Sequence, residues 1–414
     1  MGGHSRRTFL GAAGALAAVA AAPAKAQAPA PARADVVVVG AGVFGAWTAW
    51  HLRQAGRSVT LVDAWGPAHA RASSGGESRM TRTAYGGDEV YTRMAWDSLA
   101  DWRRLSDQAG LPVFHPTGVL FFFPREEEYV TKTVEVHRRL GLPTELLDQG
   151  AMRRRFPQVD FEGVALGLYE PQLGALMARR AVQTLVERFV REGGRYVQAA
   201  VQPPAGEGRL EAVVTAAGER IAADSFVFAC GPWLPRLFPD LLGNRIFPTR
   251  QEVFFFAPPA GDGRFGPGSL PGWADFNGGD IYYGFPDLEA RGFKIAHDRH
   301  GPPIDPDTGD RTASEAGLAD VRAYMARRFP ILAKQPLVEA RVCQYENSAN
   351  GDLLIDRHPQ RPNLLLVGAG SGHGFKHGPA VGRLAADLAL GRVATAGERF
   401  SLASKATVQN RSVH

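Results

Sequence analysis

The stretch "ADVVVVGAGVFGAWTAWHLRQAGRSVTLVDAW", residues 34–65, predicts a strand, a tight glycine turn, a helix and a second strand. Residues 35–39 form a largely apolar, β-branched run, as expected for a strand that is buried on both faces of a sheet. The helix is expected from about residue 44 to residue 55, with Gly56 as its stop. This order begins a doubly wound α/β domain built around a parallel sheet.

The turn carries the glycine spacing G-x-G-x-x-G of a dinucleotide-binding site, at Gly40, Gly42 and Gly45. Gly40 permits the sharp turn, Gly42 leaves room for a pyrophosphate beside the backbone, and Gly45 lets the helix approach the strand. The first helical residues, Val43 and Phe44, would direct their N–H groups and the positive end of the helix dipole towards that pyrophosphate.

The second strand ends in Asp63, whose carboxylate can hydrogen-bond both ribose hydroxyls of an adenosine. Strand, turn, helix and acid together make this a strong signal, and a glycine turn that binds no ligand is the structural alternative. The motif by itself does not separate NAD from FAD.

A second glycine cluster, "NLLLVGAGSGHGFKHGPAVGRLAADLAL" at residues 363–390, separates the two cofactors. It repeats the order strand, glycine turn and helix, which a single nicotinamide domain does not need. A flavin does need it, because reduction places negative charge on the N1–C2=O edge of the ring and a helix N-terminus stabilises that charge. We therefore predict FAD, with contacts in this turn from Gly370, Gly372, His373, Gly374, Phe375 and Lys376.

Between the two clusters, "ADSFVFACGPWLP" at residues 223–235 predicts another buried strand, which runs up to the cofactor at Gly231. Cys230 beside it is expected to be a small buried residue. The only other cysteine, Cys343, could pair with it as a disulfide. A chain that folds in a reducing cytoplasm meets oxidants late, which argues against that pairing.

The N-terminal stretch "SRRTFLGAAGALAAVAAAPAKAQA", residues 5–28, resembles a twin-arginine export signal, with a plain secretory signal as the alternative. We therefore expect export through the twin-arginine machinery and a periplasmic or extracellular protein. The apolar run is too short and too weakly apolar for a stable membrane span. Residues 1–28 carry three basic residues and no acid, so most of the formal charge of +5 leaves with them. The interspersed charges that remain give no support to nucleic-acid binding.

Four further segments carry a resemblance to a known family: "SRMTRTAYGG" (residues 78–87), "IYYGFPDLEARGFKIAHDRHGPPIDPDTGD" (281–310), "VCQYENSANGDLLIDRHP" (342–359) and "GAGSGHGFKHG" (368–378). With the first glycine motif they resemble the monomeric sarcosine oxidase and N-methyltryptophan oxidase group of the D-amino-acid-oxidase-like flavoproteins. The resemblance covers nearly all of the chain after residue 28. It implies a flavoenzyme that oxidises the C–N bond of a secondary or primary amine, usually one beside a carboxylate, to an imine. The reduced flavin would return its electrons to O₂ as hydrogen peroxide.

The resemblance implies roles for residues near the flavin ring. Cys343 matches a cysteine that bonds covalently to the 8α-methyl of FAD, and a thiolate suits attack on an electron-poor ring. Lys294 matches a lysine that promotes the reaction with O₂, where a fixed positive charge stabilises superoxide. Arg79 matches an arginine beside the ring, and Ser78 and Val201 are further expected cofactor contacts.

The resemblance also implies how the substrate binds. Lys376 and Arg82 match a pair of cations, one point-like and one forked, that holds the substrate carboxylate. Tyr283 and Tyr345 match tyrosines that line the substrate cavity. For each of these residues, an ordinary salt bridge or a core aromatic is the alternative. With the carboxylate held, hydride transfer from substrate to flavin N5 needs no strong protein base.

Two positions depart from the family pattern. The family commonly has a histidine four residues before the arginine that matches Arg79, and this chain has Gly75 there. It also has a histidine four residues after the lysine that matches Lys294, and this chain has Asp298 there. His297 either replaces the lost imidazole or faces solvent. Both departures fall on the substrate side of the flavin and argue against sarcosine itself as the substrate.

The expected fold class is a two-domain α/β chain. Residues 33–110, 170–240 and 350–395 would form a doubly wound, Rossmann-like FAD-binding domain, and residues 111–169 and 241–349 a substrate domain with a mixed or antiparallel sheet. The aromatic-rich runs "PTGVLFFFP", "RQEVFFFAPP" and "GGDIYYGF" supply strands of that second sheet, which would roof the flavin. Residues 396–414 are expected to be a polar, weakly ordered tail. We predict no metal site.

Three functions agree with these features. An amine or amino-acid oxidase that uses O₂ is favoured by Lys294. The alternatives are a dehydrogenase that passes electrons to a quinone or a carrier protein, and a flavin-binding protein without catalytic activity.

Overall fold

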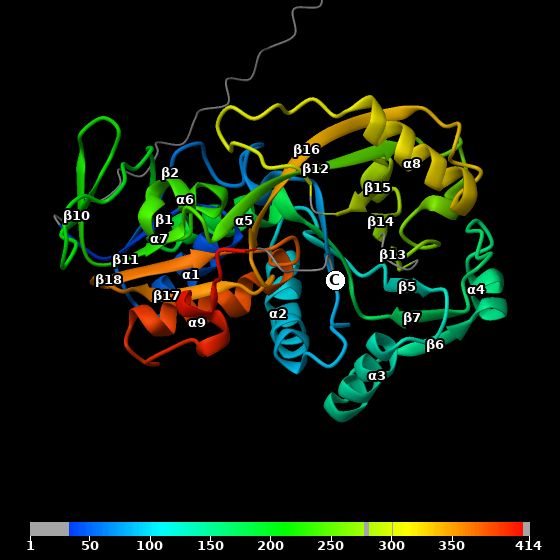
Figure 1. Ribbon diagram of the computed structural model, residues 1–414, viewed down its shortest axis with the longest axis horizontal. Coiled ribbons are helices and arrows are strands. Elements are labelled where there is room, and N and C mark those ends of the chain that lie inside the picture. Colours follow the sequence, from blue (N-terminus) through cyan, green and yellow to red (C-terminus); the bar gives the residue numbers. More distant parts are fainter. Residues whose placement is uncertain (1–32, 277–280, 300, 409–414) are drawn as a thin grey trace, which may run out of the picture. The chain divides into compact units, whose positions relative to one another are not determined.

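The computed structural model describes residues 33–276, 281–299 and 301–408 (Figure 1). The expected export signal at residues 1–28 lies outside these ranges. Among the helices within them, none is both long and apolar enough to cross a bilayer.

The first sheet is mainly parallel. Its strands, in spatial order, are β17 (Leu354–His358), β18 (Arg361–Gly368), β11 (Arg220–Phe228), β1 (Ala34–Val39), β2 (Val59–Asp63) and β9 (Arg195–Gln198), and β10 (Ala212–Val214) pairs with β11. β1 lies between β2 and β11 and runs parallel to both, and β9 and β18 continue the parallel pattern. β10 and β17 pair antiparallel with their neighbours.

Burial on both faces explains the unbroken apolar run of β1. Val36 and Val38 belong to a core that includes α1 (Val43–Gln54), α5 (Ala178–Arg191) and α9 (Gly378–Ala389). Val37 and Val39 belong to a second core that includes the short helices α6 (Leu234–Leu237) and α7 (Pro239–Leu242). Helices therefore cover both faces of the sheet, which is the doubly wound arrangement that the first glycine motif predicts.

Two glycines of the first turn are required by close backbone approach. A Cβ atom on Gly40, whose φ is +103°, would stand 2.4 Å from the carbonyl oxygen of Ala229. A Cβ atom on Gly45 would stand 1.8 Å from the carbonyl oxygen of Gly40. Only glycine therefore lets α1 begin directly beside the ends of β1 and β11.

Within the described residues the second sheet has eight strands and is mainly antiparallel. In spatial order they are β16 (Leu337–Ser348), β12 (Ile246–Phe256), β15 (Phe293–Asp298), β14 (Ile281–Phe285), β13 (Gly272–Phe276), β5 (Val119–Phe123), β7 (Leu166–Glu170) and β6 (Glu145–Asp148). β5 and β13 pair in parallel. Helix α8 (Glu315–Arg328) packs on this sheet through an aromatic core that includes Trp273, Tyr324 and Phe329.

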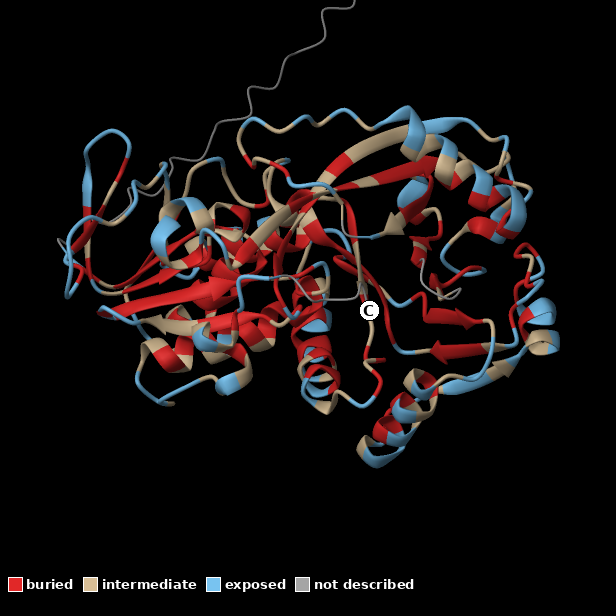
Figure 2. Ribbon diagram, viewed as in Figure 1, coloured by how far each residue is buried: buried red, intermediate tan, exposed pale blue. Residues whose placement is uncertain are grey.

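A small third sheet joins β3 (Ser78–Thr81), β8 (Gly174–Met177) and β4 (Phe114–His115). The remaining α-helices are α2 (Glu89–Asp107), α3 (Glu128–Leu140) and α4 (Gln149–Arg155). Figure 2 shows the strands of the first sheet mainly buried, whereas α3 and α8 keep one exposed face. The predicted fold class, a doubly wound α/β unit with a second mixed sheet, is confirmed. The exact domain boundaries stay a prediction.

The expectation of a weakly ordered tail is wrong for its described part, which ends at residue 408. Two short 3₁₀ turns, Glu398–Phe400 and Leu402–Ser404, follow Gly397. Phe400 is buried, and so is Lys405. The sequence of this segment is polar and gives no local sign of this order, because the contacts that fix the segment come from distant parts of the chain.

Candidate active site

Two cavities meet at strand β16, with volumes of 460 Å³ and 320 Å³. The first is lined by eleven of the predicted site residues: Ser78, Arg79, Arg82, Tyr283, Lys294, Cys343, Tyr345, Gly372, His373, Phe375 and Lys376. The second lies at the carboxyl ends of β1 and β2 and is lined by Gly40, Gly42, Val43, Phe44, Asp63, Val201 and Gly231. Three of the predicted glycines line neither cavity: Gly45, Gly370 and Gly374. Because they have no side chain, neighbouring segments can pack closely against them.

In the second cavity, Asp63 fixes the turn that follows β1. Its Oδ2 accepts the N–H of Ala41 at 2.7 Å, and its Oδ1 accepts the N–H groups of Trp65 and Gly66 at 2.9 Å. A carboxylate offers about four acceptor positions, so Oδ2 can still accept a ribose hydroxyl.

Ser74 completes the start of α1, and the sequence gives no local signal for it. Its hydroxyl accepts the N–H of Val43 at 3.1 Å from a loop 31 residues further along the chain. A Cβ on Gly42 would meet that hydroxyl at 3.5 Å and nothing closer, so this glycine leaves the helix N-terminus open to the cavity.

Tyr85 does not itself line the first cavity, but it contacts Arg82 and Lys376, the two lining cations that are expected to bind a carboxylate. Nζ of Lys376 donates to the Tyr85 hydroxyl at 2.8 Å and to the carbonyl oxygen of His373 at 2.7 Å. The guanidinium of Arg82 lies 4.0 Å from the centroid of the Tyr85 ring, in cation–π contact. Sequence reasoning missed Tyr85, although it stands three residues after Arg82 in the quoted "SRMTRTAYGG".

Two histidines complete the surroundings of the Tyr85 hydroxyl. Nδ1 of His373 lies 3.1 Å from it and Nε2 of His377 lies 2.8 Å from it. Burial, with the positive charge of Lys376 nearby, holds the pKa of His377 well below its usual range. His377 is therefore a neutral imidazole, and it leaves the positive charge of this wall to Lys376 and Arg82.

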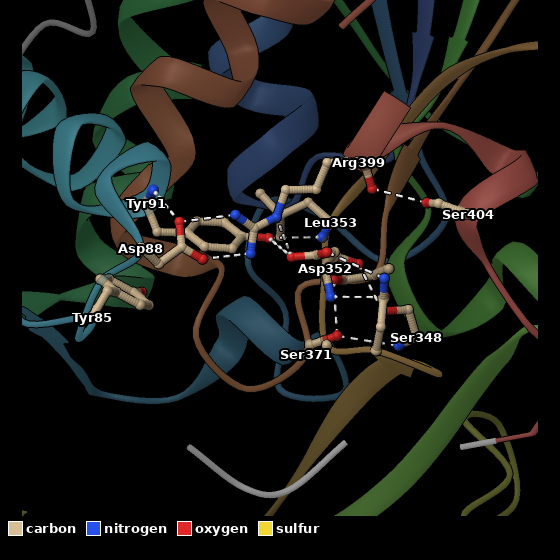
Figure 3. Close-up of polar contacts among 12 residues, drawn as sticks. Tyr85, Asp88, Tyr91, Ser348, Asp352, Leu353, Ser371, Arg399 and Ser404 are labelled. Atoms are coloured by element: carbon tan, nitrogen blue, oxygen red, sulfur yellow. Dashed lines mark hydrogen bonds and ion pairs between the residues drawn. The ribbon is translucent and has the colours of Figure 1, made fainter. Parts of the chain in front are cut away.

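The C-terminal segment braces this wall through Arg399 (Figure 3). Its guanidinium pairs with both oxygens of Asp88 and, through Nε at 2.7 Å, with Asp352. The same Asp352 oxygen accepts the hydroxyl of Tyr91 at 3.0 Å. The Tyr91 ring stacks on Tyr85 with centroids 5.3 Å apart. Arg399 is thus linked to Lys376 and Arg82 through two side chains, Tyr91 and Tyr85.

On the other side of the cavity, Cys343 lies beside Arg79. Its sulfur accepts from Nη2 of Arg79 at 3.4 Å, and that guanidinium also donates to the carbonyl oxygens of Ser73 and Ser78. Cys343 and Cys230 are both free thiols, so the disulfide alternative is not realised.

Lys294 is buried in the wall near Cys343. Nζ donates to the carbonyl oxygen of Ser78 at 2.9 Å and lies over the rings of Phe285 and Tyr283, 5.0 Å and 5.9 Å from their centroids. Burial, assisted by the charge of Arg79, lowers the pKa of Lys294 to about 7. This amine can therefore gain or lose its charge near neutral pH.

The two positions that depart from the family pattern, Asp298 and Gly75, both line the first cavity, and the structure shows what surrounds each of them. Asp298 accepts the hydroxyl of Tyr345 at 3.1 Å, and burial and this carboxylate raise the pKa of Tyr345 well above its usual range. Gly75 leaves no space for a side chain, because a Cβ would stand 2.0 Å from the carbonyl oxygen of His69. An imidazole at position 75 would require a different path of this loop.

His297 does not lie in this cavity, which corrects its prediction as a site residue. Alternation along β15 places Lys294 and Asp298 on the cavity face and His297 on the opposite face. There its ring stacks on Tyr282 at 4.2 Å, and its Nδ1 lies 2.8 Å from Asp320. It lines a separate cavity of 540 Å³.

Comparisons with known proteins give a family, from a family model and sequence relatives, and a shared fold, from a solved structure. The family model described as FAD dependent oxidoreductase, DAO, matches residues 35–388. The monomeric sarcosine oxidase of Streptomyces avermitilis is 32% identical over 361 residues, which cover 86% of this chain and 93% of that protein. The N-methyl-L-tryptophan oxidase of Salmonella heidelberg is 28% identical over 362 residues, covering 86% and 95%. Among solved structures, L-proline dehydrogenase from P. horikoshii shares the fold, with a TM-score of 0.76, 21% identity and coverage of 89% and 97%.

Proposed function

Because the chain belongs to the DAO family of FAD-dependent oxidoreductases, we propose that it oxidises the C–N bond of a secondary or primary amino acid to an imine and passes the electrons to O₂. The observation that carries this proposal is the wall where Tyr85 joins Arg82 and Lys376, in the cavity that also holds Cys343 and Lys294. The sarcosine oxidase and the N-methyl-L-tryptophan oxidase named above support it, because both are named as oxidases of amino acids.

The residues of the two cavities fit FAD. The open N-terminus of α1 at Gly42 suits a diphosphate, and Oδ2 of Asp63 suits a ribose hydroxyl. Cys343 and Arg79 lie in the adjoining cavity, which would take the ring system. When bound there, FAD supplies the acceptor for the two electrons of amine oxidation.

Arg82 and Lys376 would hold the carboxylate of the substrate. Their different shapes, a planar fork and a point charge, can bind both carboxylate oxygens without competing for one position. Phe121, Tyr129, Phe276 and Ile281 line the same cavity and reduce its water content. Fixing the carboxylate in such surroundings orients the rest of the substrate and removes much of the entropic cost of reaction.

The carboxylate of Asp298 would attract the positively charged amine group of the substrate. It stands in the same cavity as the two cations, and Tyr345 donates to it. A zwitterionic amino acid has its positive group close to its carboxylate, so opposite charges on the protein match it. We therefore propose an N-alkyl, cyclic or primary amino acid, and not sarcosine specifically. It is zwitterionic in solution, and its ammonium group releases a proton to solvent so that the neutral amine undergoes hydride transfer.

Two further roles support the oxidase assignment. We assign to Cys343 a covalent thioether to the 8α-methyl of FAD, supported by its place in the first cavity beside Arg79. To Lys294 we assign the promotion of the O₂ reaction, supported by its buried amine, which can carry a charge in a nearly apolar wall. A dehydrogenase with another electron acceptor would not need that charge.

We also propose export by the twin-arginine route, supported by Arg6 and Arg7 before an alanine-rich run. Fractionation of cells that express the full chain should recover flavin-containing protein outside the cytoplasm. Replacement of both arginines by lysine should retain it inside, and unchanged export of that variant would contradict this route.

The proposed activity is tested by screening purified protein against N-methyl, cyclic and primary amino acids while O₂ uptake and hydrogen peroxide are recorded together. We expect equal amounts of O₂ consumed and peroxide formed with at least one zwitterionic amine. Oxidation of amino acids that proceeds only with an added quinone, and without O₂ uptake, would favour the dehydrogenase alternative.

A further inference from the structure

Glu346 is a buried acid in the wall of the second cavity, and the sequence analysis gave it no role. Alternation along β16 places Tyr345 in the first cavity and Glu346 in the second. Oε1 of Glu346 accepts the N–H of Gly370 at 3.3 Å. Oε2 is also buried, and it has no hydrogen-bond partner in the described part of the chain.

Three glycines lie close to this carboxyl group. A Cβ on Gly231 or Gly368 would approach Oε2 to 3.4 Å and 3.5 Å, and a Cβ on Gly370 would approach Oε1 to 3.3 Å. The missing side chains leave the carboxyl group beside the cavity that Gly42 and Phe44 also line, at the start of α1. An unpartnered buried oxygen in such a place lacks the hydrogen bond that nearly all buried polar groups have.

The charge state of this group follows from its burial. Burial raises the pKa of Glu346 to about 8, against the opposing effect of the N–H groups of Gly370 and Ala369. At neutral pH the carboxyl group is therefore protonated, and because Oε1 accepts the N–H of Gly370 while Oε2 accepts none, the proton belongs on Oε2. Oε2 is then a hydrogen-bond donor without an acceptor.

The other ionisable groups that line this cavity do not pair with the carboxyl group of Glu346. They are Cys230, Asp63, His69, Arg236 and Asp307, and none of them forms a hydrogen bond or an ion pair with Glu346 in the described chain. Burial raises the pKa of the Cys230 thiol as well, so this neighbour stays neutral where Glu346 titrates.

We propose that Glu346 is a cofactor-binding residue whose carboxyl group donates a hydrogen bond from Oε2 to an oxygen of the ribityl–diphosphate chain of FAD. The proposal rests on the part of the proposed function that places FAD across the two cavities. Glu346 lines the second cavity, as Gly42 does, and its neighbour Tyr345 lines the first, so an FAD molecule that occupies both cavities would pass close to Glu346. Phosphate oxygens and ribityl hydroxyls both accept from a neutral acid, whereas an ionised carboxylate would repel the diphosphate.

The test measures FAD affinity and not activity. Full-length protein with Cys343→Ala, which keeps FAD exchangeable, is stripped of flavin and titrated with FAD while flavin fluorescence is followed. Glu346→Leu removes the donor at similar volume, and we expect FAD to bind it about 10–100 times more weakly at neutral pH. Glu346→Gln keeps an N–H donor that cannot titrate, and we expect an affinity within about threefold of the parent.

The pH dependence distinguishes a donor from a packing residue. The parent should hold FAD equally well below about pH 8 and lose affinity above it, because ionisation removes the donor and adds a negative charge. Glu346→Gln should show no such loss. Equal FAD affinity of the parent and Glu346→Leu, or the same pH profile for the parent and Glu346→Gln, would overturn the proposal.

ADP as a second probe locates the acceptor. Weaker binding of both ADP and FAD to Glu346→Leu assigns the acceptor to the diphosphate, and weaker binding of FAD alone assigns it to the ribityl chain. Matching thermal unfolding curves of the flavin-free variants exclude misfolding, and if Glu346→Leu does not fold, the pH profile of Glu346→Gln decides. Absence of FAD binding to protein that retains Glu346 would contradict the proposed function itself, and it is therefore distinct from a failure of this inference.

Discussion

The hydroxyl of Tyr85 lies 2.8 Å from Nζ of Lys376 and fixes that ammonium in the wall of the first cavity. The Tyr85 ring contacts the guanidinium of Arg82 at the same time. One aromatic side chain therefore sets the spacing of the two cations to which we assign the substrate carboxylate. This geometry makes Tyr85 a positioning residue, because it acts through Lys376 and Arg82.

Replacement of Tyr85 by Phe removes the hydroxyl and keeps the ring. Lys376 loses this acceptor and gains conformational freedom, whereas Arg82 keeps its cation–π contact. We expect KM for the amino acid to rise about tenfold, as for the loss of one hydrogen bond to a charged group, with a smaller change in kcat. Steady-state kinetics measures this, and an equal fall of kcat with unchanged KM would contradict the positioning role.

Lys294 predicts a pH dependence of the oxygen reaction. Because its pKa is lowered to about 7, its positive charge is present below that pH and is lost as the pH rises through it. The rate at which O₂ reoxidises reduced enzyme should therefore fall between about pH 6 and about pH 8. Lys294→Met should react about a hundredfold more slowly and without this pH dependence.

Stopped-flow mixing of reduced enzyme with O₂ measures both effects, and Lys294→Arg is the matched control. Arginine stays charged throughout this range, so its rate should not fall over the same interval. A Lys294→Met variant that reoxidises as fast as the wild type would remove the O₂ role from this residue.

Arg399 should contribute to stability and to the substrate site together. Removing its contacts to Asp88 and Asp352 by Arg399→Ala should lower the free energy of unfolding by about 1–3 kcal/mol. Tyr91 would lose its neighbour, so KM should rise as well. The control is Arg392→Ala, whose exposed ion pair with Asp387 should contribute less than about 0.5 kcal/mol. Thermal unfolding that gives equal losses for both variants would contradict the bracing role.

Cys343 predicts the fate of the flavin on denaturation. If the thioether forms, acid-precipitated wild-type protein keeps its yellow colour and gains the mass of FAD less two hydrogen atoms, whose electrons pass through the flavin to O₂. The Cys343→Ala variant should release its flavin into the supernatant. A colourless wild-type pellet would remove the covalent bond and leave FAD binding through the second cavity intact. Cys230→Ala is the matched control, and it should keep the coloured pellet.

The parts of the fold that could be predicted are those with local causes. The turn at Gly40 and the acid at Asp63 are fixed by backbone geometry within about thirty residues, and both lie where the motif places them. The aromatic runs at β5, β12 and β14 likewise predicted strands of one sheet. Tyr85, Ser74 and Glu346 could not be found in this way, because their roles come from contacts between distant segments.

His297 and Asp298 show a signal that was present and could have been used. Once Lys294 is placed in the cavity, a strand period of two also places Asp298 there and turns His297 away. The order of the C-terminal segment had no such signal. Arg399 reaches Asp88 across 311 positions of sequence, and no local pattern indicates that contact.

We propose that this flavoenzyme oxidises amino acids whose carboxylate is held by Arg82 and Lys376. It is tested most directly by mixing the enzyme without O₂ with pairs of amines that differ only in their carboxylate, while the absorbance of the oxidised flavin is followed. We expect that the amino acid of at least one pair bleaches the flavin at least about a hundredfold faster than its decarboxylated partner. We also expect that Arg82→Met abolishes this preference. Equal bleaching by both members of every reactive pair, or no bleaching by any amine, would contradict this proposal.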